Sequence, residues 1–201
     1  MLPIALNAGN RIPRRETVTR RRMEGFLYLA AFFATVPIAN WMIGHVGTVC
    51  VAGGPCLIPV APGLMAPSGV LMIGAAFVLR DLVQRRLGKG WTVGAILAGG
   101  ALSGLFAPRA LVVASVTAFL ISEFADFAVY TPLQRRRFML AVFASSVVGL
   151  AIDSIVFLYL AFGSLEFLAG QIVGKAWMVV LAMPLVRWLR DRERRLAMEA
   201  A

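Results

Sequence analysis

Long apolar stretches alternate with short basic stretches along this chain. Six apolar segments occupy residues 25–45, 64–79, 91–106, 110–130, 138–162 and 168–188. Each approaches the ~20 residues that a helix needs to cross the hydrocarbon of a bilayer, although the second and third are short. Helices are expected because an open-ended segment in lipid satisfies its own backbone groups only as a helix. The pattern predicts an all-α, polytopic membrane protein with six transmembrane helices.

Composition leads to the same class. The 201 residues are 60% hydrophobic and only 15% charged, and the mean hydropathy is +0.81. This leaves too little polar surface to cover a water-soluble globule. The net charge is +10, but the basic residues flank apolar runs and do not cover one face of a domain. We therefore expect no nucleic-acid binding.

The basic residues predict the orientation in the membrane. All but two of the 20 Lys and Arg residues lie in clusters, and the exceptions are Arg109 and Lys175. The clusters occupy residues 11–22, 80–89, 135–137 and 187–195. Basic loops stay on the cytoplasmic side. We therefore expect both termini in the cytoplasm, in a bacterial inner membrane.

The same pattern divides the chain. We expect a basic cytoplasmic tail over residues 1–22, a six-helix transmembrane domain over residues 23–189 and a C-terminal cytoplasmic tail over residues 190–201. Everything before Met23 is dispensable to such a bundle, so the sequence allows translation to start at either Met1 or Met23.

Few residues offer enzyme chemistry. Cys50 and Cys56 lie in a Gly/Pro-rich connection that we expect on the outer side. A disulfide and two free thiols both fit this spacing, and no His or acid lies nearby to complete a metal site. The sequence contains no nucleotide loop, zinc motif or nucleophile elbow, and it has one His. We expect no enzyme, no metal and no cofactor.

Two ionisable residues fall deep inside predicted spans. Asp153 and Lys175 lie at similar depths when residues are counted from the outer ends at ~1.5 Å each. Gln171 precedes Lys175 by one turn on the same face. Intramembrane charges are costly and persist where they pair or line a cavity. A structural ion pair and a substrate cavity both explain them, and the accompanying polar groups favour the cavity.

Further polar candidates lie on other predicted helices. Glu123 and Asp126 point together on the fourth helix because they are three residues apart, and we assign Glu123 to the cavity. Interfacial solvation or loop packing is expected for Asp126, Arg80 and Asp81. Asn40 follows Pro37 by about one turn, and this proline opens a polar notch in the first helix.

Four stretches carry a resemblance to a known family. They are residues 76–88 (AFVLRDLVQRRLG), 118–126 (AFLISEFAD), 152–157 (IDSIVF) and 173–175 (VGK). From about residue 23 to residue 188 the chain resembles the vitamin uptake transporter family. The best-known members of that family are queuosine precursor transporters.

The resemblance implies a fold and a substrate. The implied fold is a six-helix bundle similar to the substrate-binding (S) subunits of energy-coupling factor transporters. The implied activity is uptake of 7-cyano-7-deazaguanine or a related deazapurine. The polar positions that match the family are Asp81, Gln84, Glu123, Asp126, Asp153 and Lys175.

The chemistry of a deazapurine fits these residue types. A guanine-like edge carries two adjacent N–H donors, which the carboxylate of Glu123 or Asp153 can accept side by side. Gln171 or Asn40 can recognise the carbonyl edge. An aromatic ring can stack on the heterocycle, and the candidates are Phe157 and Trp177.

Two alternatives remain beside this hypothesis. The first is a vitamin-binding subunit that depends on a shared energy-coupling ATPase module, with Ala30 and Ala34 as the docking face. The second is a non-transporting membrane scaffold whose buried charges only hold helix packing. The expected partners are the small-molecule substrate, the lipid bilayer and, in the first alternative, the ATPase module.

Overall fold

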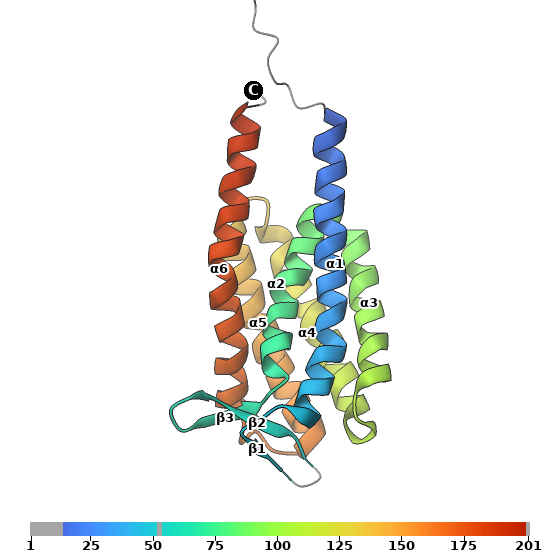
Figure 1. The fold of residues 1–201 in the computed structure, drawn as a ribbon, viewed down its shortest axis with the longest axis vertical. Coiled ribbons are helices and arrows are strands. Elements are labelled where there is room, and N and C mark those ends of the chain that lie inside the picture. Colours follow the sequence, from blue (N-terminus) through green and yellow to red (C-terminus); the bar gives the residue numbers. More distant parts are fainter. Residues whose placement is uncertain (1–13, 52–53, 200–201) are drawn as a thin grey trace, which may run out of the picture.

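The computed structural model describes residues 14–51 and 54–199. Within these ranges the chain forms a bundle of six helices that run alternately up and down (Figure 1). A single 3-10 turn, η1 (Arg109–Leu111), precedes the fourth helix. The helices are α1 (Arg14–His45), α2 (Val70–Leu87), α3 (Lys89–Phe106), α4 (Val112–Leu133), α5 (Phe138–Phe162) and α6 (Leu168–Glu199).

Four helices are long and apolar enough to cross a membrane, namely α1, α4, α5 and α6. The chain is therefore a multi-pass, predominantly helical membrane protein. Helices α2 and α3 have 18 residues each, which corresponds to a length of ~27 Å against a hydrocarbon core of ~30 Å. All six predicted helices are present, whereas six complete crossings stay a prediction.

Helix α2 occupies the centre of the bundle. It contacts each of the other five helices, and the residues from Ala76 to Gln84 are buried except for the half-buried Leu79. Phe77 and Leu82 pack in one apolar cluster with Tyr130 and Leu150. Because neighbouring helices surround it, α2 can hold charged side chains that a lipid-facing helix could not.

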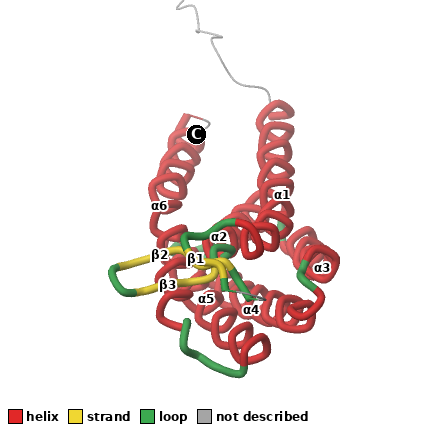
Figure 2. The backbone as a smooth tube through the Cα atoms, turned by 60° about the horizontal axis from the view of Figure 1, so that its bottom comes forward, coloured by secondary structure: helices red, strands yellow, loops and turns green. Residues whose placement is uncertain are grey.

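A small sheet replaces the predicted start of the second helix. Residues 64–67 form strand β3 (Leu64–Pro67), which pairs antiparallel with β2 (Cys56–Ala61), and β2 pairs with β1 (Val49–Cys50). The β2–β3 turn holds Pro62 and Gly63, and Gly63 adopts a φ of 73°, which favours glycine. The expectation of a helix from residue 64 was wrong because this turn folds residues 64–67 back onto β2, and the helix begins only at Val70. The sheet lies across one end of the bundle (Figure 2), which we call the sheet end.

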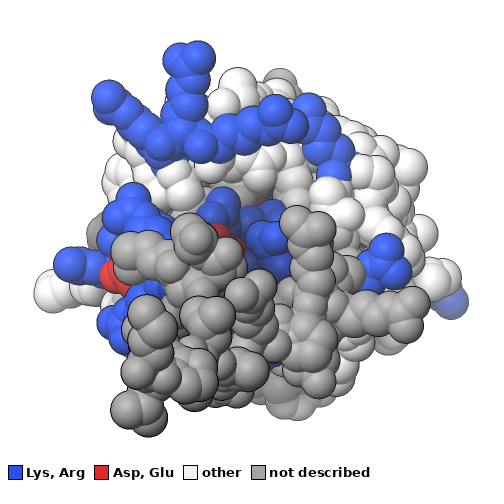
Figure 3. All heavy atoms as spheres, turned by 90° about the horizontal axis from the view of Figure 1, so that it is seen from above, with Lys and Arg blue, Asp and Glu red and all other residues white. Residues whose placement is uncertain are grey.

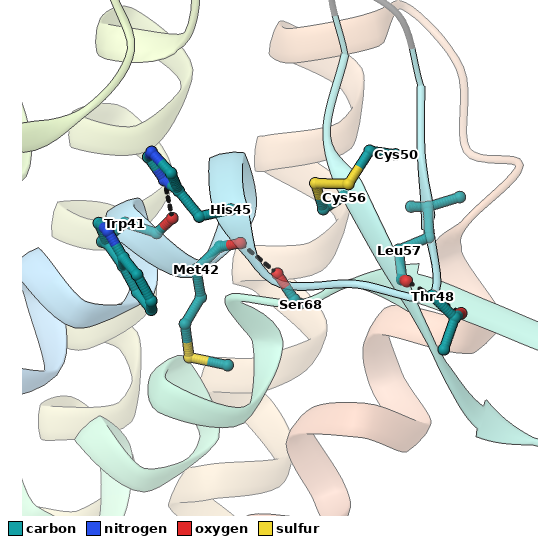
Figure 4. The surroundings of a disulfide bond; sticks show 8 residues. All are labelled: Trp41, Met42, His45, Thr48, Cys50, Cys56, Leu57 and Ser68. Atoms are coloured by element: carbon teal, nitrogen blue, oxygen red, sulfur yellow. Dashed lines mark hydrogen bonds between the residues drawn. A yellow bond between two sulfur atoms is a disulfide. The ribbon is translucent and has the colours of Figure 1, made fainter.

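A disulfide joins the first two strands. Cys50 and Cys56 stand opposite each other in the β1–β2 register and are bonded. Figure 4 shows the bond beside the hydrogen bond that Ser68 donates to the carbonyl of Met42, at 2.7 Å. Of the two alternatives that the sequence left open, the structure contains the disulfide.

The opposite end of the bundle is rich in arginine, and we call it the basic end. Viewed toward this end, Lys and Arg side chains gather on the surface (Figure 3), and several arginines line a hollow there. Arg86 and Arg192 both pair with Glu24, at 3.1 and 2.8 Å, while Arg85 and Arg86 pair with Glu193. These ion pairs tie α1, α2 and α6 together, and there α1 and α6 extend beyond the predicted spans 25–45 and 168–188.

The expected basic loop over residues 80–90 is mostly helix. Helix α2 continues to Leu87, and Gly88 alone separates it from α3. Gly88 adopts a φ of 91°, a conformation that glycine reaches without steric cost. Arg80 consequently lies inside the bundle and not in a loop.

Candidate functional site: a polar cavity beside a buried charge cluster

Lys175 organises the polar residues near the sheet end. Its Nζ donates to Asp153 Oδ2 at 2.6 Å, to Ser154 Oγ at 2.8 Å and to Gln171 Oε1 at 2.6 Å. These acceptors use all three protons of the ammonium group. We call these four residues the lysine cluster. The structure thus brings together the partners that depth counting along α5 and α6 predicted, and it adds Ser154.

A close approach of two helices positions the lysine. Gly74 of α2 packs against the α6 backbone, and a Cβ built on Gly74 would lie 2.9 Å from the Cα of Lys175. Real Cβ contacts are not that short. The absence of a side chain at Gly74 therefore sets how near α6 comes to the central helix.

The lysine cluster borders a cavity of about 60 Å³. Pro67 of β3 and Gly69 at the start of α2 contribute to its wall, so the cavity lies toward the sheet end. Its polar lining residues are Asn40, Ser103, Ser115, Asp153, Gln171 and Lys175. Its larger apolar lining residues are Val36, Ile43, Val70, Ile73, Leu111, Phe119 and Phe157.

The cavity combines free donors and acceptors. Asn40 donates its Nδ2 to the carbonyl of Val36 at 2.9 Å, which leaves its Oδ1 to accept. Gln171 accepts from Lys175 through Oε1, which leaves its Nε2 to donate. The second carboxylate oxygen of Asp153 accepts only a long hydrogen bond of 3.4 Å from Ser122.

The cavity is narrow in this conformation. A volume of about 60 Å³ holds a few water molecules and lies well below the ~300–1,000 Å³ of most small-molecule pockets. A ligand of two fused rings therefore requires the surrounding elements to move apart.

A second group of buried charges lies deeper in the bundle, on α2 and α4. Arg80 pairs with Asp81 at 2.9 Å, with Glu123 at 3.2 Å and with Asp126. All four side chains are at most 2% exposed. We call them the central charge cluster. The expectation that Arg80, Asp81 and Asp126 are solvated or loop-packed was wrong, because α2 runs through the centre of the bundle and Asp126 of α4 pairs with Arg80 there.

Polar neighbours extend this cluster toward the basic end. Ser145 of α5 donates to Asp81 at 3.2 Å. Arg80 donates to Gln84 at 3.4 Å, and Gln84 donates to Thr131 at 3.0 Å. Gln84, a family-matched position, thus links the cluster to the last turn of α4.

Two predicted cavity residues lie elsewhere. Glu123 does not line the cavity, because Arg80 engages it in the central charge cluster. Trp177 is 50% exposed and donates its Nε1 to the carbonyl of Val60 at 2.9 Å, outside the cavity. Trp177 is two residues after Lys175, and such a spacing turns a helical side chain to another face.

Sequence reasoning missed several lining residues. Ser115 and Phe119 lie on the cavity-facing side of α4, one turn apart, with Ser122 one turn further. This spacing of three to four residues was a detectable signal. Among the residues that the structure describes, no group of three His, Cys, Asp or Glu could hold a metal ion.

The comparisons with known proteins agree with a transporter. Residues 101–189 match the model of a family described as "Putative vitamin uptake transporter", which supports the resemblance found in the sequence. The match covers less than half of the chain and includes α4, α5 and the part of α6 up to residue 189, so it contains Glu123, Asp153 and Lys175 but not Arg80. No curated protein and no solved structure matches the chain.

Proposed function

We propose that this protein imports a queuosine precursor, 7-cyano-7-deazaguanine or a related deazapurine, across the bacterial inner membrane. The observation that carries the proposal is a cavity bordered by Asp153, Gln171 and Lys175, three residues that lie in the segment matching the transporter family. Buried ionisable groups that line a membrane cavity are characteristic of substrate pathways.

The free groups of the cavity complement a deazapurine. Asp153 offers a carboxylate oxygen to the paired N–H donors of a guanine-like edge, and Asn40 offers a second acceptor. The Nε2 of Gln171 donates to the carbonyl of the ring. Phe119 and Phe157 provide apolar surface on which a flat heterocycle can stack. Of the two carboxylates considered for this role, Asp153 is the better placed because Glu123 is occupied by Arg80.

Two independent features support an orientation with the sheet end outside. The arginines at the basic end follow the distribution of cytoplasmic loops. The disulfide between Cys50 and Cys56 lies at the sheet end, and disulfides persist in oxidising compartments such as the bacterial periplasm. Both features support cytoplasmic termini, and in that orientation α2 and α3 would cross as well, so the proposal includes six crossings.

Ligand binding by the purified protein tests the proposal. We expect 7-cyano-7-deazaguanine to bind in calorimetry, and we expect Asp153→Asn to weaken binding by about 10–150-fold because a charge-assisted hydrogen bond contributes ~1.5–3 kcal/mol. Glu166→Gln is the matched control, because Glu166 is exposed in the α5–α6 connection and should leave affinity unchanged.

Uptake in cells provides the second measurement. Deleting the gene should remove queuosine from tRNA in cells that are fed only the exogenous precursor. Equal affinity of wild type and Asp153→Asn would contradict the site. Absence of both binding and uptake would contradict the function and favour the non-transporting scaffold.

A second candidate, a vitamin-binding subunit that requires a shared ATPase module, keeps one specific observation in its favour. Ala30 and Ala34 are both exposed on α1, one turn apart, and small residues allow a partner helix to approach closely. Copurification of an ATPase would support this candidate. Uptake by this chain alone in reconstituted vesicles would exclude it.

A further inference from the structure

The central charge cluster is not balanced. Three carboxylates, on Asp81, Glu123 and Asp126, surround one guanidinium, on Arg80. If all were ionised, three negative charges against one positive charge would leave a net charge of −2 in a region that is at most 2% exposed. The Asp153–Lys175 pair nearby is already neutral and supplies no cation.

No other described cation reaches these carboxylates. The groups that face them are Arg80 and Asp81 on α2, Glu123, Asp126 and Tyr130 on α4, and Asp153 on α5. The next arginine along α2, Arg85, pairs with Glu193 at the basic end. A metal ion does not fit either, because the guanidinium already occupies the position between the carboxylates.

An unpaired buried carboxylate takes up a proton, because desolvation strongly disfavours its charged form and neighbouring carboxylates repel one another. A second polar group points to the same conclusion. The hydroxyl of Tyr130 is buried without a hydrogen-bond partner among the described residues, and its ring lies 5.8 Å from the guanidinium of Arg80. A protonated carboxyl can donate a hydrogen bond to this hydroxyl or to a neighbouring carboxylate, which a fully ionised set of acids cannot do.

We propose that the central charge cluster is a proton-binding site that couples uptake to the proton gradient. This inference rests on the proposed uptake function. Two protons neutralise the cluster when the one guanidinium balances one of the three carboxylates. Binding forms an O–H bond at a carboxylate oxygen with a proton taken from water, and release returns that proton to water on the other side.

Buried polar groups connect the cluster to both ends of the bundle. On the cavity side, Ser122 donates to Asp153 at 3.4 Å, and the adjacent Glu123 accepts from Arg80 at 3.2 Å. On the other side, Gln84 and Thr131 continue toward the basic end. Protons therefore enter through the substrate cavity and leave toward the basic end. A substrate bound at Asp153 would then lie beside this proton route.

Reconstituted vesicles test this coupling. Vesicles with an acidic outside should accumulate labelled 7-cyano-7-deazaguanine, because each coupled proton multiplies the accumulation ratio by about tenfold per pH unit of gradient. Asp126→Asn keeps the shape of the side chain but cannot exchange a proton. We expect this variant to lose the accumulation driven by the gradient while it keeps exchange of labelled for unlabelled precursor. Glu166→Gln should behave as wild type.

Infrared spectroscopy of the purified protein separates this inference from the proposed substrate. The wild-type protein at neutral pH should show the carbonyl absorption of a buried protonated carboxyl, and Asp126→Asn should reduce it. This band without any exchange of the precursor would support the proton site and contradict the substrate. Accumulation by the wild type that does not respond to the pH gradient, together with absence of the band from wild type, would overturn the proton site, and so would accumulation driven by sodium alone. If Asp126→Asn fails to fold, the infrared band of the wild type and its response to the pH gradient decide whether the proton site exists.

Discussion

The lysine cluster and the central charge cluster are both buried, yet they differ in balance and access. In the lysine cluster one ammonium matches one carboxylate, and these residues line a cavity. In the central charge cluster one guanidinium serves three carboxylates, and none of the four residues lines that cavity. Burial alone therefore does not define the role of an intramembrane charge. The ratio of acids to bases and the presence of adjacent space are the grounds on which we propose a solute for the lysine cluster and protons for the central charge cluster.

The largest effect is expected when the central charge cluster loses its only cation. Arg80→Met leaves three carboxylates facing one another, and removing one partner of a buried ion pair costs about 3–5 kcal/mol. We expect this loss in the free energy of unfolding, measured by denaturant titration in detergent. Arg109→Met is the control, because Arg109 is exposed at the sheet end and should leave stability unchanged. Equal stability of Arg80→Met and wild type would show that the carboxylates need no cation and would remove the distinction between the clusters.

The lysine cluster should respond differently, because it is neutral as a pair. Lys175→Met alone strands Asp153 and should cost about 3–5 kcal/mol, whereas the double change Asp153→Leu with Lys175→Met should recover most of that loss. Unfolding of both variants measures this difference. Because the pair contacts the proposed substrate, the double variant should still lose uptake. A stable double variant with normal uptake would instead indicate a purely structural pair.

The contrast between the clusters also shows what the sequence could predict. The number of helices follows from the lengths of the apolar segments, and the grouping of basic residues at one end of the bundle follows from their spacing. The contact between Asp153 and Lys175 follows from counting residues inward from the helix ends. Those rules treat each helix by itself. They assigned Arg80 to a loop because a charged residue at the end of an apolar run resembles an interface residue, and only the central position of α2 reveals that it is buried.

The sequence predicted the candidate site to a similar extent. Residues on α5 and α6 meet as their spacing indicates, but Glu123 belongs to the other cluster because Arg80, on a distant part of the chain, attracts it. The sheet could not be deduced from apolar periodicity, since its strands have only two to six residues and both β2 and β3 contain a proline. Contacts between elements far apart in the sequence therefore account for most of the errors.

A smaller effect should follow from changing the distance between the central helix and the lysine cluster. Gly74→Ala forces a methyl group against the α6 backbone at Lys175, where overpacking costs about 1–3 kcal/mol. Precursor affinity should fall as well, because Lys175 shifts. Gly94→Ala is the matched control, since Gly94 is exposed in α3 with no atom within 4 Å of an added Cβ. It should stabilise the helix by up to ~1 kcal/mol. Unchanged affinity in Gly74→Ala would mean that α2 does not position the lysine cluster.

The smallest effect concerns Trp177, which lies two residues after Lys175 but outside the cavity. Trp177→Phe removes the hydrogen bond to the carbonyl of Val60, and a single hydrogen bond contributes about 0.5–1.5 kcal/mol. Stability should fall by that amount while precursor affinity stays at the wild-type value, because the indole contacts the sheet and not the cavity. Tyr159→Phe removes an exposed hydroxyl and should change neither quantity. Calorimetric binding and unfolding of the two variants separate these outcomes. A selective loss of affinity in Trp177→Phe would return this ring to the substrate site and would extend the lysine cluster to the outer face of α6.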